Sequence, residues 1–190
     1  NDYFDFKRGA DHARRLGPTR VTQSGLLTPS EVILGMWISF AAAGISGLYL
    51  VWLRGWVILL IGGIAILSAI LYTGGPYPLG YHGLGDVFVI LFFGFTAVAG
   101  TYYVQTGQLS ILPIWSALPM GLLIDNILIV NNYRDIDSDR IAGKNTLAVR
   151  LGKQWTRRQY RLNIAVSYLI LPALALMGIF PGWGMITWFS

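Results

Sequence analysis

An oxygen-rich segment at residues 131–140 carries the residue types in this chain that are best suited to chemistry. It holds three carboxylates, two side-chain amides and two guanidiniums, in the order Asn131-Asn132-Tyr133-Arg134-Asp135-Ile136-Asp137-Ser138-Asp139-Arg140. An apolar run, residues 111–130, precedes it directly. Ionisable groups at a membrane-spanning segment are costly and by default mark a functional site. We therefore take this segment as the first candidate site.

The spacing of the polar residues in this segment indicates one shared face. If the preceding helix continues through the segment, Asn132, Asp135 and Asp139 fall within an arc of about 80°. Oxygen ligands on one face suit Mg²⁺, which typically uses one or two carboxylates together with substrate phosphate oxygens. The alternative is a solvated helix end, in which Asp135 and Asp139 pair with Arg134 or Arg140.

A second oxygen-rich cluster lies at the start of the chain. It contains Asn1, Asp2 and Asp5, and Asn1 lies one helical turn from Asp5. Two such clusters facing each other across a helical bundle would hold two Mg²⁺ ions and neutralise a diphosphate leaving group. Basic residues available for further diphosphate contacts are Lys7, Arg14, Arg20, Arg134, Arg140 and Lys144.

The composition places these clusters in a membrane protein. Of the 190 residues, 54% are hydrophobic and 12% are charged, whereas ordinary soluble domains carry about 25% charged residues. The absence of cysteine excludes disulfides and thiolate metal sites. We predict an all-α, polytopic transmembrane helical bundle with about five complete spans, at residues 32–53, 56–72, 87–104, 111–130 and 162–180. A sixth span is expected to begin at residue 183.

The chain is expected to form a single transmembrane domain over residues 1–190, truncated at both ends. Thr28, Pro29 and Glu31 form a capping-box pattern that predicts a helix start. Residues 73–86 are rich in glycine and proline and predict a loop that folds back over the membrane face. Small residues suited to close helix packing are Gly35, Gly44, Gly47, Gly62 and Gly63.

The distribution of basic residues predicts the orientation. Of the 14 Lys and Arg residues, all but Arg54 lie before residue 24 or between residues 134 and 161. With alternating spans these two segments share one face, which the positive-inside rule makes cytoplasmic. The site is therefore expected to face the cytoplasm in the cytoplasmic (inner) membrane. The basic residues 153–161 are expected to lie on anionic lipid headgroups of the bilayer and not to bind nucleic acid.

Three motifs, in order along the chain, resemble those of the UbiA superfamily of intramembrane aromatic prenyltransferases, and in particular its menaquinone branch. The motifs are Asn1-Asp2-x-x-Asp5, residues 72–81 (Tyr-Thr-Gly-Gly-Pro-Tyr-Pro-Leu-Gly-Tyr), and Asp135-x-x-x-Asp139 followed by Gly143-Lys144-x-Thr146. The resemblance covers essentially the whole chain. It implies nine transmembrane helices in two pseudo-repeated halves, of which this chain would hold the end of the second through the seventh.

The resemblance also implies a function. Members of this branch use Mg²⁺ to transfer a polyprenyl group from a polyprenyl diphosphate to 1,4-dihydroxy-2-naphthoate, an aromatic acid acceptor, with decarboxylation to a demethylmenaquinol. Catalytic residues would be Asn1, Asp5, Asp135 and Asp139. Metal ligands would be Asn1, Asp2, Asp5, Asn132, Asp135 and Asp139. Diphosphate contacts would be Lys7, Arg20, Arg134, Arg140 and Lys144.

Two departures from the superfamily pattern and several alternatives stay open. Gly9 stands where the broader superfamily often has a further Asp, and Asp125 stands where a small or apolar residue is expected. Asp125 is either a buried structural carboxylate or a group that acts on metal or protons. His82 is a candidate base or an ordinary polar contact. Rival functions are prenyl transfer to 4-hydroxybenzoate, homogentisate or a chlorophyllide, a metal-ion transporter, and a fragment without activity.

Overall fold

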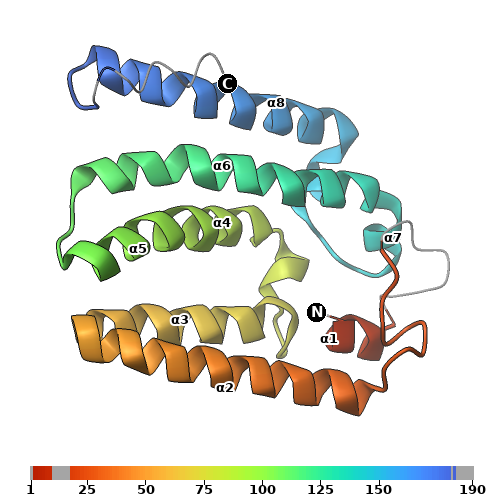
Figure 1. Cartoon of the computed structure of the whole chain (residues 1–190). Coiled ribbons are helices and arrows are strands. Elements are labelled where there is room, and N and C mark those ends of the chain that lie inside the picture. Colours follow the sequence, from red (N-terminus) through yellow and green to blue (C-terminus); the bar gives the residue numbers. More distant parts are fainter. Residues whose placement is uncertain (1, 10–17, 181, 183–190) are drawn as a thin grey trace. The chain divides into compact units, whose positions relative to one another are not determined.

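In the computed structural model of the chain, residues 2–9, 18–180 and 182 are described, and every regular element among them is helical (Figure 1). The chain divides into two compact units. The first contains α1 (Asp2–Lys7), α2 (Pro29–Arg54), α3 (Trp56–Thr73), η1 (Leu79–His82) and α7 (Ile136–Ile141). The second contains η2 (Ile90–Thr96), α5 (Ala97–Thr106) and most of α4 (Gly85–Val89), of α6 (Ile111–Arg134) and of α8 (Leu147–Leu176).

Local sequence signals set the boundaries of α2 and α3. The capping box predicted at the start of α2 is confirmed, because Glu31 N donates to Thr28 Oγ1 and Thr28 N donates to the Glu31 carboxylate. Gly55 ends the helix with a φ of 81°, a value that favours glycine. The tight turn there lets α3 return beside α2. Trp52 and Trp56, which flank the turn, are both strongly exposed, as aromatic residues at a membrane interface should be.

In the second unit, the helix over Gly85–Thr106 contains a π-helical segment, η2, where it packs on α6. Gly94 and Gly121 make the close contact: a Cβ on Gly94 would lie 2.8 Å from both Ala117 O and Gly121 Cα. Only glycine lets two backbones approach so closely, and small residues play this part between membrane helices. By contrast, a Cβ on any of the five glycines predicted to pack would meet no described atom within 4 Å. That prediction is wrong for the described residues, because the close backbone approach lies elsewhere.

Polar side chains connect α8 to the neighbouring helices of the second unit. Asn163 Nδ2 donates to Asp125 Oδ2 at 3.0 Å, and Ser167 Oγ donates to Pro119 O at 3.2 Å. Gln159 Nε2 donates to Asp86 Oδ1 at 2.7 Å. Asp125 is only 1% exposed, in keeping with the buried structural carboxylate that was one of the two sequence-based interpretations.

The all-α membrane bundle predicted from composition is confirmed, with four of the five expected spans found among the described residues. Among the described residues, four helical stretches are long and apolar enough to cross a membrane: Pro29–Arg54, Trp56–Thr73, Gly85–Thr106 and Ile111–Arg134. The expected fifth span is helical as far as Leu176, as the second part of α8, which carries no charged residue after Arg161. Gly152, with a φ of 79°, divides this helix near its start and separates off its first turn. The sixth span, expected from residue 183, lies outside the residues that the structure describes. The chain is an all-α, multi-pass membrane protein.

The Gly94 contact yields a prediction about stability. Gly94→Ala should lower the free energy of unfolding by about 1–3 kcal/mol, because the added methyl group meets backbone atoms that cannot move aside. Thermal unfolding in detergent would measure this effect. Gly100→Ala, six residues further along, is the matched control: its Cβ meets no described atom within 4 Å, so it should be neutral or slightly stabilising. Equal losses in both variants would contradict the packing role of Gly94.

Candidate functional site

The oxygen-rich segment is not one continuous helix. α6 ends at Arg134, α7 begins at Ile136, and Asp135 between them has φ −96° and ψ 8°. The expectation that Asn132, Asp135 and Asp139 line one face assumed an unbroken helix, and that assumption is wrong. Asp135 adopts a bridge conformation that is only sparsely populated and is common at active-site residues. The break lets Asp135 lie at the junction of two helices.

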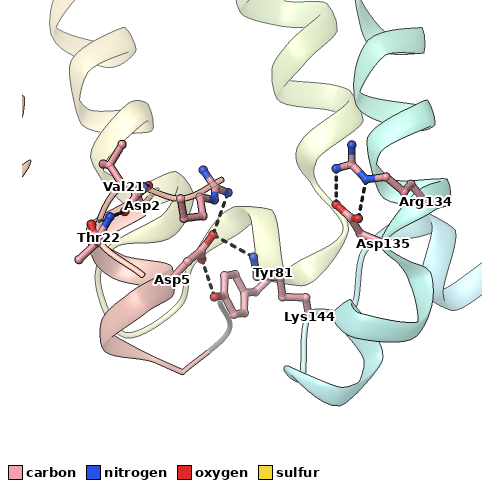
Figure 2. Close-up of polar contacts among 9 residues, drawn as sticks. Asp2, Asp5, Val21, Thr22, Tyr81, Arg134, Asp135 and Lys144 are labelled. Carbon is pink, nitrogen blue, oxygen red and sulfur yellow. Dashed lines mark hydrogen bonds and ion pairs between the residues drawn. The ribbon is translucent and has the colours of Figure 1, made fainter. Parts of the chain in front are cut away.

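Asp135 is paired with its neighbour in the chain. Arg134 Nε donates to Asp135 Oδ1 and Arg134 Nη2 to Asp135 Oδ2, both at 2.7 Å (Figure 2). This bidentate geometry is the strong form of an arginine–carboxylate pair. The pair matches the salt-bridged helix end that was one alternative from the sequence. Asp135 is 8% exposed, whereas Asp137 is exposed to solvent.

The second acidic cluster contains the most enclosed carboxylate of the first unit, that of Asp5. This residue is 2% exposed, and three side chains from distant parts of the chain converge on it (Figure 2). Tyr81 Oη donates to Oδ1 at 2.7 Å, Lys144 Nζ lies 3.0 Å from Oδ2, and Arg20 Nη2 lies 3.6 Å from Oδ2. A carboxylate buried this deeply needs such partners, because an isolated charge away from water is very costly.

Backbone turns aim Lys144 at Asp5. Gly143 has a φ of 72°, and Lys144 N donates to Asp139 O at 2.8 Å, so the chain reverses directly after α7. Asn145 N then donates to Tyr81 O at 2.8 Å, which ties this turn to η1. The Asp139 backbone therefore positions Lys144, and Lys144 neutralises Asp5. Lys144 thus joins the two acidic motifs, although their carboxylates form no shared cluster among the described residues.

The glycine- and proline-rich loop is fixed by cations from both sides. Arg150 Nη2 donates to His82 O at 3.0 Å, and Arg8 donates to Thr73 O and Gly75 O, both at 2.6 Å. The Arg8 guanidinium carbon lies 5.1 Å, and Lys144 Nζ 4.9 Å, from the centre of the Tyr81 ring. Cations at this range are attracted to an aromatic ring. The loop thus packs within the first unit through Tyr81, which is buried.

Asp2 has a different environment from Asp5. Its carboxylate accepts hydrogen bonds from Val21 N at 3.2 Å, Thr22 N at 3.1 Å and the Thr22 hydroxyl. Burial raises the pKa of Asp2, but these hydrogen bonds and the charge of Arg20 outweigh burial and lower the pKa below its ordinary value. The stabilisation from Asp2 is therefore present at neutral pH and is lost as the pH falls through the folded-state pKa. In this arrangement Asp2 holds the turn after residue 20 in place.

The remaining predicted site residues differ in their exposure to solvent. Lys7 is exposed, and its Nζ lies 6.0 Å from the Tyr3 ring centre. Arg140, in α7, is exposed as well. Asn132 is half-buried near the end of α6. Asn1 and Arg14 lie outside the described residues. The sequence analysis did not predict that Arg8 would bind the glycine- and proline-rich loop. The only signal in the sequence was its position directly after Lys7.

His82 has an ordinary structural environment. Its Nδ1 lies 2.9 Å from Pro78 O, and its ring stacks on Tyr77 with the ring centres 3.5 Å apart. Both contacts are within the loop and orient it. The interpretation of His82 as a polar contact, rather than as a base, agrees with this geometry.

The side chains of the site that could hold a metal ion are carboxylates. No group of three or more His, Cys, Asp or Glu residues gathers within the described part of the chain. Both oxygens of Asp5 and both of Asp135 are engaged by basic or hydroxyl groups. The available donors are nevertheless carboxylate oxygens, which suit a hard cation such as Mg²⁺. In the structure these oxygens are bound to Lys144 and Arg134 and do not form a metal site among the described residues.

The fold and the site are those of a multi-pass membrane protein with a buried, ion-paired carboxylate. The model of the UbiA prenyltransferase family matches residues 1–190. The chain is 40% identical over 190 residues to the 1,4-dihydroxy-2-naphthoate octaprenyltransferase of Escherichia coli (strain K12), a match that covers 97% of this chain and 62% of that protein. It is 41% identical over 176 residues to the protein of the same name from Mycobacterium tuberculosis, covering 93% and 60%.

A vertebrate relative is similar as well. The UbiA prenyltransferase domain-containing protein 1 of Danio rerio is 37% identical over 180 residues, covering 92% of this chain and 52% of that protein. This chain belongs to the UbiA prenyltransferase family. It spans about three fifths of the length of the bacterial relatives it matches.

Tyr81 provides a test of the buried centre. Burial raises the pKa of Tyr81, the hydrogen bond to Asp5 and the charge of that carboxylate raise it further, and Arg8 opposes them. The un-ionised Tyr81 therefore stabilises the fold at all pH values below about 10, and this contribution is lost only as the pH rises through the folded-state pKa. In an ultraviolet titration of the folded protein up to about pH 11, Tyr81→Phe should leave the absorbance change on tyrosine ionisation unaltered.

The same variant unfolded in guanidinium chloride is the control. There it should lose the absorbance change of one of the chain's 10 tyrosines. A loss of that size in the folded protein would contradict the enclosed environment of Tyr81.

Proposed function

We propose that the protein containing this chain transfers a polyprenyl group from a polyprenyl diphosphate to 1,4-dihydroxy-2-naphthoate. The observation that carries the proposal is the buried Asp5 carboxylate, held by Lys144 and Arg20 at the end of a set of apolar helices. Such a centre holds both the acidic groups that a metal–diphosphate complex needs and the cations that bind its oxygens. The names of the two bacterial relatives support the choice of acceptor.

Lys144 is the central residue in this account. Its ammonium group, bound to Asp5 in the structure, would pair with the diphosphate of the substrate when that group arrives. Arg20, now paired with Asp5, and Arg134, now paired with Asp135, would also turn to the diphosphate. The exchange replaces one ion pair by another, so no cation is left unpaired in a poorly hydrated site. Lys7 and Arg140, both exposed, would assist at the edge of the site.

Mg²⁺ fits the carboxylates that this exchange releases. Asp5, Asp135 and Asp139 would hold it, with Asn1, Asp2 and Asn132 as the further predicted ligands. When bound, Mg²⁺ would neutralise charge on the departing diphosphate. The unusual backbone of Asp135 supports this role, because residues held in sparsely populated conformations cluster at functional sites.

The chemical step follows from the two substrates. The allylic C–O bond breaks and its electron pair leaves with the diphosphate. The ring carbon that bears the carboxylate then forms a bond to the prenyl carbon, and the carboxylate leaves as CO₂, so that the electron pair of the broken C–C bond restores the aromatic ring. Tyr81 and the loop that carries it would exclude water from the allylic cation. The prenyl tail would lie among the apolar helices, with the diphosphate at the cytoplasmic face of the inner membrane.

Carboxylate substitutions test the diphosphate site. Asp135→Asn and Asp139→Asn should each lower the rate of prenyl transfer by roughly 100-fold or more, because each removes a charge that would hold the metal–diphosphate complex. The assay uses membranes with the full-length protein, a polyprenyl diphosphate and Mg²⁺. Asp137→Asn is the matched control, since Asp137 is exposed and lies between the other two. Near-normal rates in both site variants would remove the proposal.

Acceptor choice is tested separately. The same membranes should convert 1,4-dihydroxy-2-naphthoate to a prenylated, decarboxylated product and should leave 4-hydroxybenzoate unchanged. The product, identified by mass spectrometry, should disappear when EDTA removes the metal. A product from 4-hydroxybenzoate alone would retain the diphosphate chemistry and overturn the acceptor.

A further inference from the structure

A groove in the second unit contains none of the residues of the Asp5 centre and has no role in the proposed reaction. It is formed by the last turns of α6 and by α8 after Gly152, and its volume is about 340 Å³. Its apolar part comes from Ile129 and Val130, and Tyr160 lines it as well. Both aliphatic residues belong to the candidate membrane span Ile111–Arg134. The groove therefore adjoins the hydrocarbon region at the end of a span.

Arginines form the polar part of the groove, and one of them is held in place. Arg157 Nε and Nη2 both donate to Tyr133 Oη, at 3.0 and 2.5 Å, and the guanidinium carbon lies 5.3 Å from the Tyr133 ring centre. Arg161 lies one helical turn further along α8 and lines the same groove. A cation that is already ordered loses little side-chain freedom when it binds an anion.

Charge around the groove is strongly one-sided. α8 contains Arg150, Lys153, Arg157, Arg158 and Arg161 and no Asp or Glu over its whole length. The exposed Trp155, with the Arg158 guanidinium carbon 5.2 Å from its ring centre, lies on the same stretch. Basic residues mixed with an exposed tryptophan are typical of a helix at the boundary between lipid and water.

We propose that this groove binds one anionic phospholipid, with the phosphodiester between Arg157 and Arg161 and an acyl chain along Val130. Two guanidiniums match a phosphodiester in charge and in hydrogen-bonding geometry. The apolar part favours a lipid over a free phosphate, because a soluble anion would leave Val130, which is 52% exposed, uncovered. The site is independent of prenyl transfer and needs no metal ion.

Native mass spectrometry of the full-length protein in detergent, titrated with phosphatidylglycerol, tests this site. Arg157→Gln combined with Arg161→Gln should weaken binding of the first lipid molecule about 30-fold, since each cation near the membrane surface contributes about a fivefold factor. Tyr133→Phe, which keeps both charges but releases Arg157, should weaken it less. Unchanged binding in both variants would overturn the proposal.

A charge-matched control separates a groove from general attraction. Lys153→Gln combined with Arg158→Gln removes the same charge from the same helix but outside the groove, and should leave the first binding event nearly unchanged. Equal weakening in the two double variants would mean diffuse attraction and would overturn the site. Displacement of the lipid by glycerol phosphate, equal binding of phosphatidylcholine, or competition by a polyprenyl diphosphate would each overturn an anionic-lipid site as well.

Discussion

The arrangement of the first unit depends on keeping one buried carboxylate compensated. Asp5 is almost fully enclosed, and its partners come from parts of the sequence up to 139 residues away. Removing one member of a buried ion pair typically costs about 3–5 kcal/mol. The contacts of Lys144 and Tyr81 with the Asp5 carboxylate therefore hold their turn and their loop against α1. The proposed binding of an anion would therefore use the same side chains that stabilise the unit. A ligand that takes Lys144 from Asp5 must offer at least equal charge.

The helix break at Asp135 and the glycine contact in the second unit serve different ends. Asp135 interrupts the helix between α6 and α7, and the reversal at Gly143 directs Lys144 towards Asp5. In the second unit, the approach of Gly94 to Gly121 and the hydrogen bond from Asn163 to Asp125 fix neighbouring helices by packing and polar contact. Membrane helices need both, because the lipid offers no hydrophobic drive for their association.

Much of the fold was predictable because its signals are local. The capping box at Thr28 and Glu31 and the apolar length of the spans are read from adjacent residues, and both are confirmed. The break at Asp135 was missed because no glycine or proline marks it. The contacts of Asp5 with Tyr81 and Lys144 depend on tertiary folding, so the sequence indicated these residues individually but not the pairing. Glycine packing was assigned to the wrong helices because composition does not reveal which backbones approach.

In the proposed reaction, the Asp5 centre binds a diphosphate by exchanging its ion pairs. The most direct measurement is equilibrium binding of an unreactive prenyl thiodiphosphate to the full-length protein, with Mg²⁺ and with EDTA, for the parent sequence and for Lys144→Met. The account predicts binding that requires Mg²⁺ and is weakened at least about tenfold by Lys144→Met, since a charge-assisted contact contributes about 1.5–3 kcal/mol. Binding that is indifferent both to Mg²⁺ and to the loss of Lys144 would contradict it.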